Sequence, residues 1–141
     1  MGNIDVTWNT INEQVEHISD LVKQNNIDMI VGIARGGLVP AVMVSNRTKV
    51  PMQSLEWQTR DGNGTDRKKL IELQLDKYNC LFIDDICDTG KTIFGIREVF
   101  PGAKFAVLFN KMVDMELDFE GVRLYNNTQY QIKQWINFPW E

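Results

Sequence analysis

The fold of this chain is decided by the stretch CLFIDDICDTGKT, residues 80–92. Its first four residues form a continuous apolar run, which is typical of a central strand buried on both faces of a sheet. Two acidic residues and a turn at Gly90 follow, and an apolar stripe at helical spacing then runs from Ile93 to Phe100. The stretch therefore predicts a strand, a loop and a helix N-terminus, a place where converging backbone N–H groups bind phosphate.

Asp84 and Asp85 stand directly after the apolar run, where unpaired charges cost desolvation energy. Carboxylates in such a place are expected to meet cations or hydroxyl groups, so the pair beside a phosphate loop suggests a sugar phosphate with a divalent metal. An ordinary helix cap by Asp88 or Thr89 is an alternative use of the loop. A nucleotide-hydrolysing P-loop is excluded, because the first glycine of its pattern would fall on Asp85.

Residues on the N-terminal side repeat the same order of elements. The apolar run from Met29 to Ile33 predicts a strand, Arg35-Gly36-Gly37 predicts a turn, and Leu38 to Asn46 predicts a helix. An earlier helix, with its cap at Thr10, is expected to end near Asn25. With a further strand at residues 104–109, this alternation predicts an α/β fold with a mostly parallel central sheet flanked by helices.

The segment between residues 52 and 75 departs from this pattern. Ile71, Leu73 and Leu75 alternate with polar residues, as in a half-buried strand, and two glycine-containing turn dipeptides precede them. We therefore expect an antiparallel excursion there. Its polar tip, at about residues 58–69, is either a flexible hairpin lid or a solvated loop.

Length and composition favour one globular domain over residues 1–141, with 43% hydrophobic and 24% charged residues. The net charge of −4 argues against nucleic acid as a partner. Cys80, Cys87 and the one histidine are too few for a structural zinc site, and a reduced, cytoplasmic location is expected. No apolar run approaches the ~20 residues of a membrane-spanning helix, and no secretory leader is expected.

The stretch at residues 80–92 resembles the phosphoribosyl-diphosphate signature of type I phosphoribosyltransferases, in which four apolar and two acidic residues precede a D-[ST]-G-x-T loop. Nearly the whole chain is similar to the bacterial xanthine-guanine phosphoribosyltransferases of that family. The similarity includes Ala34 to Pro40, Phe109-Asn110-Lys111 and the tail from Trp135 to Trp140. The segment from Met112 to Tyr130 matches the family poorly.

The resemblance implies transfer of 5-phosphoribose from phosphoribosyl diphosphate to a 6-oxopurine (xanthine, guanine or hypoxanthine), with release of pyrophosphate, in purine salvage. Such a transfer passes through an oxocarbenium-like sugar, so the enzyme has to neutralise the leaving diphosphate and hold the base in line. The resemblance also implies a type I phosphoribosyltransferase-like fold with a small C-terminal base-binding hood at about residues 110–141. It further implies Mg²⁺ as cofactor and a homo-oligomer, either a dimer or a tetramer.

Roles follow from the family pattern at matching positions. The loop from Asp88 to Thr92 would hold the 5-phosphate, Asp84 and Asp85 the ribose hydroxyls, and Asp85 the magnesium ion. Arg35-Gly36-Gly37 matches the diphosphate loop, with a plain tight turn as the alternative. Either Lys68 or Lys69 corresponds to a lysine of the lid. The residues implied for phosphoribosyl diphosphate are therefore Arg35, Gly36, Gly37, Lys68, Lys69, Asp84, Asp85, Asp88, Thr89, Gly90, Lys91 and Thr92.

Base recognition is implied for the C-terminal third of the chain. Lys111 would donate to the purine 6-oxo group, Trp135 would stack on the ring, and the Ile136 backbone would meet the ring edge near C2. A hydrophobic anchor is the alternative role for Trp135, because large aromatic side chains usually pack. Asp88, Asp85 and Arg35 are the implied catalytic residues, with Asp88 as proton acceptor on the purine N7 side.

Two other functions remain open at this point. One is a regulator of the same fold that binds nucleotides without chemistry. The other is a phosphoribosyltransferase for another base, which Lys111 and Trp135 together disfavour. Under each of these interpretations the partners are small molecules, and no nucleic acid or membrane is implied.

Overall fold

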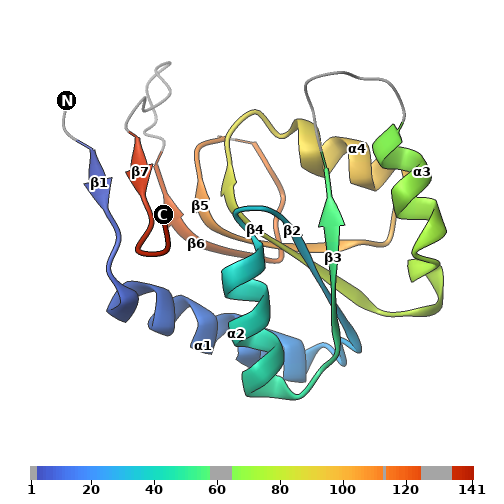
Figure 1. Cartoon of the computed structure of the whole chain (residues 1–141), viewed down its shortest axis with the longest axis horizontal. Helices are drawn as coiled ribbons and strands as arrows, with labels where there is room; N and C mark the ends of the chain where they lie inside the picture. The colour runs from blue at the N-terminus through green and yellow to red at the C-terminus, as the bar shows by residue number, and fades with distance from the viewer. Residues whose placement is uncertain (1–2, 58–64, 113, 125–134) are drawn as a thin grey trace.

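A five-stranded sheet forms the centre of the protein in a computed structural model that describes residues 3–57, 65–112, 114–124 and 135–141 (Figure 1). Its strand order is β3-β2-β4-β5-β6, and every neighbouring pair runs parallel, which confirms the predicted sheet. The strands are β2 (Met29–Ala34), β3 (Met52–Glu56), β4 (Cys80–Cys87), β5 (Lys104–Asn110) and β6 (Phe119–Arg123).

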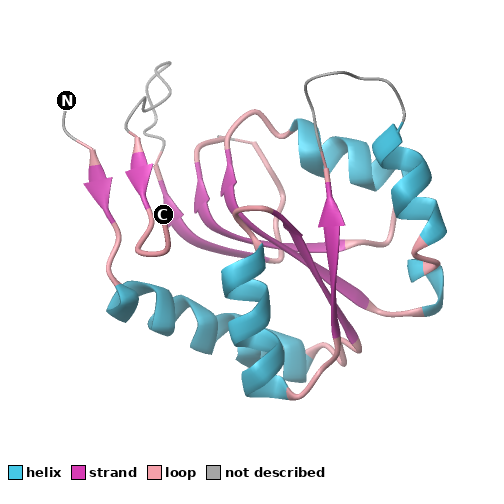
Figure 2. Ribbon diagram, viewed as in Figure 1, coloured by secondary structure: helices cyan, strands magenta, loops and turns pink. Residues whose placement is uncertain are grey.

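Helices cover both faces of this sheet (Figure 2). One face carries α1 (Trp8–Gln24) and α2 (Leu38–Thr48), and the other carries α3 (Thr65–Glu72) and α4 (Lys91–Val99). None of the helices in the described part of the chain has the length and apolar character that crossing a membrane requires.

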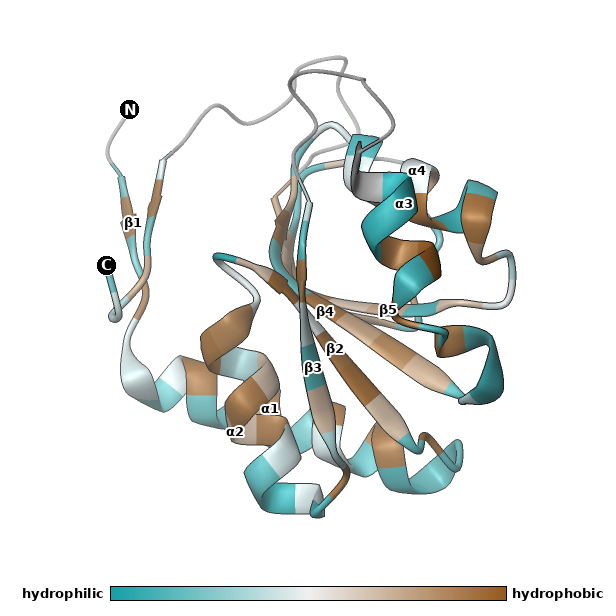
Figure 3. Cartoon of the chain, turned by 45° about the vertical axis from the view of Figure 1, so that its right-hand side comes forward, coloured by the Kyte–Doolittle hydropathy of each residue, from teal (hydrophilic) through white to brown (hydrophobic). Residues whose placement is uncertain are grey.

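The apolar run at the start of β4 is buried on both faces, as predicted (Figure 3). Leu81 and Ile83 pack in the core beneath α1 and α2, whereas Phe82 packs in the core beneath α3 and α4. This division follows the two-residue period of a strand, in which successive side chains point to opposite faces. The central position of β4 therefore follows directly from its sequence.

Helix α1 begins earlier than the predicted cap at Thr10. Thr7 is the N-cap, and its side-chain oxygen accepts a hydrogen bond from the Thr10 backbone N–H at 3.2 Å. Trp8, the first helical residue, contacts Trp140 with a centroid distance of 6.0 Å. This contact joins segments far apart in the sequence. The local pattern around Thr10 therefore did not indicate that the helix begins at Trp8. The C-terminal end at Gln24 agrees with the prediction.

The antiparallel excursion predicted between residues 52 and 75 is wrong. Strand β3 joins the sheet parallel to β2, so the chain needs a long crossover before β4. Helix α3 and a short 3-10 helix, η1 (Leu75–Lys77), supply it. Ile71 is 64% exposed although Leu75 is buried, which contradicts the shared buried face expected for Ile71, Leu73 and Leu75 in a strand. Residues 58–64 of the expected lid lie outside the described part of the chain.

A second, two-stranded sheet joins the ends of the chain. Strand β1 (Ile4–Asp5) pairs parallel with β7 (Ile136–Asn137), with Ile4 opposite Ile136. Phe138 follows β7 and packs edge-on against Phe109 of β5, with 5.7 Å between ring centroids. Of the region predicted to form a hood, β6 completes the main sheet, while β7 stands apart with β1.

A polar cluster closes the end of the sheet where β4 and β5 begin. The Asn79 side chain donates to the Asn25 and Asn26 carbonyls at 2.8 and 3.1 Å and accepts from Lys104 Nζ at 2.9 Å. Its backbone N–H also donates to Asp28 Oδ1 at 2.7 Å. The Asn79 amide thus ties the end of α1 to the start of β5.

Replacing Asn79 with alanine removes all three side-chain hydrogen bonds. We expect Asn79→Ala to lower the free energy of unfolding by about 1–3 kcal/mol, because the carbonyl and ammonium partners lose a directed contact. Urea denaturation measures this as a lower midpoint with an unchanged slope. Asn46→Ala, an exposed site on α2, is the matched control, and an equal loss there would contradict the assignment.

Candidate active site at the carboxyl ends of β2, β4 and β5

Three loops meet at one edge of the sheet. Arg35-Gly36-Gly37 follows β2, the loop from Asp88 to Gly90 follows β4, and Lys111 follows β5. These three strands are neighbours and run parallel, so their carboxyl ends lie together (Figure 1). In open α/β sheets this edge is where ligands bind.

The loop after β2 lies against β4 so closely that no side chain fits. A Cβ atom on Gly36 would overlap the Asp85 carboxylate, and one on Gly37 would overlap the Ile83 carbonyl oxygen. The peptide bond between Ala34 and Arg35 is cis, and the Gly37 N–H donates to the Ile33 carbonyl at 2.9 Å. Both glycines are therefore required by close approach, and Arg35 is exposed beside them.

The two acidic residues lie inside β4, which continues to Cys87 rather than ending at Ile83 as expected. Asp84 Oδ1 accepts from the Asp85 N–H at 2.8 Å, and Asp85 Oδ1 accepts from the Ile86 N–H at 2.7 Å. Burial raises the pKa of the Asp84 carboxyl well above its usual value, and the neighbouring Asp85 charge raises it further. Placing a second negative charge beside Asp85 is therefore unfavourable at this position in the protein without ligands.

The loop after β4 opens onto a cavity of about 270 Å³. Asp84 lines it, as do the loop from Asp88 to Gly90 and the first turn of α4. Gly90 has a φ of 79° and forms the N-cap of α4 without a side-chain cap hydrogen bond. Gly90 rather than Asp88 or Thr89 occupies the N-cap position, while the Thr89 hydroxyl accepts a hydrogen bond from the Lys91 N–H, the first of the helix, at 3.4 Å.

Both cysteine thiols remain protonated at neutral pH. Burial raises the pKa of Cys87 to about 11, and the Asp84 and Asp88 charges act in the same direction. Burial likewise raises the pKa of Cys80 to about 11. Cys87 thus fills space beneath the loop rather than acting as a nucleophile.

Lys111 lies beside the loop from Asp88 to Gly90, because its backbone N–H donates to the Cys87 carbonyl at 2.9 Å. The side chains of Met112 and Met115 lie against Gly90. A Cβ atom there would come within 2.6 Å of Met112 Sδ and 2.7 Å of Met115 Cε. The sequence did not point to these two methionines, because their stretch matched no motif.

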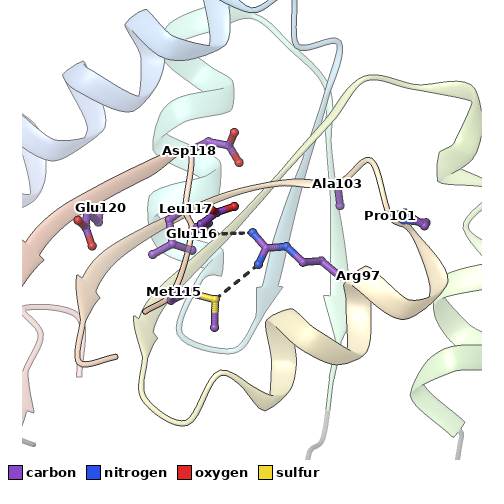
Figure 4. A pocket seen from close by; sticks show the side chains of 8 residues that line it. All are labelled: Arg97, Pro101, Ala103, Met115, Glu116, Leu117, Asp118 and Glu120. Carbon is purple, nitrogen blue, oxygen red and sulfur yellow. Dashed lines mark hydrogen bonds between the residues drawn. The ribbon is translucent and has the colours of Figure 1, made fainter. Parts of the chain in front are cut away.

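Arg97 of α4 contacts the segment that follows Lys111, at Met115 and Glu116 (Figure 4). Its guanidinium donates to Met115 Sδ at 3.5 Å and to the Glu116 carbonyl, and it lies 5.0 Å from the Phe105 ring centroid. A hollow of about 730 Å³ lies here, lined by Arg97, Pro101, Ala103, Met115, Glu116, Leu117, Asp118 and Glu120. Arg97 therefore connects α4 with Met115 and Glu116 in the segment after Lys111.

Of the predicted site residues, Asp84 and Asp88 to Thr92 line the cavity of about 270 Å³, and the others lie outside its lining. Trp135 is 65% exposed, so the alternative in which it is a packed anchor does not hold, and Ile136 is buried in β7. Lys68 is exposed on α3, and Lys69 pairs with Glu56 at 3.2 Å. The structure thus brings the three loops to one edge of the sheet, and Lys69 reaches the same edge through Glu56, which stands opposite Ala34 at the end of β3.

Known proteins resemble this chain in sequence and in fold. The family model for the phosphoribosyl transferase domain matches residues 7–141. The xanthine-guanine phosphoribosyltransferase of Cereibacter sphaeroides is 32% identical over 79% of this chain and 68% of its own length. That of Chromohalobacter salexigens is 28% identical over 96% of this chain and 82% of its own.

Solved structures show the same fold. A purine phosphoribosyltransferase from Pyrococcus horikoshii aligns with a TM-score of 0.73 and 26% identity, covering 100% of this chain and 95% of that one. The xanthine-guanine-hypoxanthine phosphoribosyltransferase of Helicobacter pylori aligns with a TM-score of 0.66 and 17% identity, covering 99% and 93%. From the match to residues 7–141 and the relative at 32% identity, this chain belongs to the phosphoribosyltransferase family.

Proposed function

We propose that this protein is a purine phosphoribosyltransferase of purine salvage. It transfers 5-phosphoribose from phosphoribosyl diphosphate to a 6-oxopurine, which is xanthine, guanine or hypoxanthine, and releases pyrophosphate. The observation that carries this proposal is the acidic pair on β4 beside the cavity at the start of α4. The bacterial relatives named xanthine-guanine phosphoribosyltransferase support the class of base.

The cavity at the phosphate loop suits the 5-phosphate of the substrate. Asp88 to Thr92 supply the turn and the first N–H groups of α4, where the helix dipole favours an anion. We assign the ribose hydroxyls to Asp84 and Asp85, whose carboxylates can accept from them. Arg35-Gly36-Gly37 would receive the diphosphate, because the missing side chain of Gly36 lets an anion approach the backbone and Arg35 adds positive charge, while the Gly37 N–H is used by the Ile33 carbonyl.

The same residues fit a magnesium ion that arrives with the substrate. In the described part of the chain, no three carboxylate, histidine or cysteine side chains are grouped to hold a metal by themselves. Mg²⁺ needs fewer protein ligands, because it is usually bound by one or two carboxylates together with substrate phosphates. We assign Asp85 as its ligand, supported by the excess negative charge beside Asp84. The bound ion would neutralise the leaving diphosphate.

Catalysis by the chain itself consists of positioning and charge. Arg35 would add positive charge at the leaving diphosphate, which matters most as the sugar becomes oxocarbenium-like. Asp88 would accept the proton on the N7 side of the purine as the new bond forms to the ring nitrogen. Both groups lie in loops at the same sheet edge, where Asp85 is found.

The base would be held from the other side of the site. Lys111 would donate to the 6-oxo group, Trp135 would stack on the ring with its exposed face, and the Ile136 backbone would meet the ring edge near C2. Lys68 or Lys69 would reach the diphosphate when a lid closes. We further propose that the protein is a cytoplasmic homo-oligomer, either a dimer or a tetramer.

The function is tested by incubating the purified protein with phosphoribosyl diphosphate, Mg²⁺ and each purine in turn. We expect nucleoside monophosphate and pyrophosphate from at least one 6-oxopurine and none from adenine, because the adenine 6-amino group would face Lys111 donor to donor. Binding of the product nucleotide without turnover would instead indicate a regulator. Efficient use of adenine would overturn the assignment of the base.

Lys111→Met tests the same contact from the protein side. Leaving the hydrogen bond to the 6-oxo group unmade costs ~1.5–3 kcal/mol, which lowers kcat/KM for the 6-oxopurine roughly 10- to 150-fold. The KM for phosphoribosyl diphosphate should stay nearly constant. Lys23→Met, in the exposed last turn of α1, is the matched control. Equal losses for both substrates would make Lys111 a structural residue.

Asp85→Asn tests the acidic pair. Asparagine has nearly the same shape but carries no charge to balance a divalent ion, so we expect activity to fall on the order of a hundredfold while the fold survives. Steady-state rates over a range of Mg²⁺ concentrations measure the first effect, and thermal unfolding checks the second. Asp76→Asn, an exposed matched change in η1, should leave both unaltered. Full activity of Asp85→Asn would remove the residue from the site.

Asp84→Asn should separate stability from activity. The pKa of Asp84 is higher in the folded protein than in the unfolded chain. The free energy of unfolding therefore falls as the pH rises from the pKa of the unfolded state through the pKa of the folded state. The variant lacks this cost, so without ligands it should melt at a higher temperature than wild type at pH 8, by a margin that shrinks toward pH 5. Its catalytic rate should nevertheless fall. A margin that does not depend on pH would contradict the electrostatic cause.

A further inference from the structure

Asn110, the last residue of β5, is a fully buried polar residue next to Lys111. Both ends of its side-chain amide are used. Oδ1 accepts from the Met112 backbone N–H at 2.9 Å, and Nδ2 donates to Glu120 Oε2 at 2.8 Å. A buried amide with both ends bonded has one orientation, because turning it round would set donor against donor.

The Met112 contact makes Asn110 part of the turn that carries Lys111. An asparagine whose oxygen binds the N–H two residues later closes an Asx-turn, which replaces a backbone turn. On the other side of Lys111, its own N–H donates to the Cys87 carbonyl at 2.9 Å. Both peptide groups that flank the Lys111 α-carbon are therefore held, one by β4 and one by the Asn110 side chain.

Glu120 decides which way the Asn110 amide points. It lies on β6, and Figure 4 shows its carboxylate across the hollow from Arg97. A carboxylate accepts but does not donate, so it selects the NH₂ end of the amide and leaves the oxygen for Met112. The charge on Glu120 also makes the hydrogen bond stronger than one between neutral groups.

We propose that Asn110 and Glu120 are positioning residues that set the affinity for the purine by fixing the turn at Lys111. The proposal rests on the proposed function, in which Lys111 donates to the 6-oxo group. Neither residue touches the substrate in this scheme. Their effect is to fix the direction in which the Lys111 side chain leaves the backbone, so that less backbone freedom is lost when the base binds.

The proposal is tested by exchanging the amide at position 110 and the carboxylate at position 120. Asn110→Asp keeps the oxygen for the Met112 N–H but places two carboxylates at hydrogen-bond distance, so the side chain has to move. We expect the KM for the 6-oxopurine to rise on the order of tenfold, with the KM for phosphoribosyl diphosphate within about twofold of wild type. Adding Glu120→Gln supplies a donor to the new carboxylate, and the double variant should recover to within about threefold of wild type.

Single variants at Glu120 complete the double-mutant cycle with Asn110→Asp. Glu120→Gln alone can still present an oxygen to Asn110 and should raise the purine KM no more than about threefold. Glu120→Ala removes the acceptor and serves as a second test if Asn110→Asp does not fold; we expect a several-fold rise in the same KM. Glu116→Gln is the matched control, because its side chain is exposed and only its backbone contacts Arg97.

The outcomes separate this proposal from the proposed function. Wild-type protein that forms no nucleotide from any 6-oxopurine would overturn the function. Active wild type with an unaltered purine KM in both Asn110→Asp and Glu120→Ala would overturn the positioning role alone. Equal rises in both substrate KM values, or a double variant no better than Asn110→Asp, would make the pair a structural contact only.

Discussion

The backbone of Gly36 and Gly37 rests directly on β4, and the rest of the site takes its position from that contact. No side chain can be placed between the loop and the strand, because a Cβ atom on either glycine would overlap β4. The loop after β2 is thereby set beside Asp85, while β5 sets Lys111 against the Cys87 carbonyl on the other side of the same strand. Strand β4 thus positions both the loop after β2 and the residue after β5, and the burial of its first four residues makes it a rigid support.

Charge gives the site its second constraint. The chain is acidic overall, with a net charge of −4, and its site brings two carboxylates together where it is proposed to accept a polyanionic substrate. Burial and the adjacent charge raise the pKa of Asp84, so the folded protein without ligands carries an electrostatic cost at that position. Proteins tolerate such a cost where function requires it.

Strong local patterns predicted much of this fold, and contacts between distant segments account for the errors. The strand at residues 80–83, the helix after Gly90 and the parallel sheet follow from an apolar run, a glycine turn and a regular alternation of elements. The alternation of Ile71, Leu73 and Leu75 pointed to a strand, but the parallel pairing of β3 with β2 requires a crossover, and the chain forms α3 instead. Thr10 fits a capping box, yet the cap is Thr7, and Trp8, the first residue of the helix, contacts Trp140 from a distant part of the sequence. The amide of Asn110 and the methionines on Gly90 belong to no motif, so only the three-dimensional arrangement reveals them.

The pairing of β1 with β7 has a consequence for how the protein is made. The Asn137 side chain donates to the Asp5 carboxylate across 132 positions of sequence, and the two short strands between them supply few other contacts. Loop closure over such a distance is entropically expensive, and it is repaid only when the intervening sheet already stands. A nascent chain leaving the ribosome can assemble β2 to β5 while β1 is still without its partner. Strand β7 can pair with β1 only after Ile136 and Asn137 have been made, so the residues proposed to hold the base take their places after those proposed to hold the phosphate.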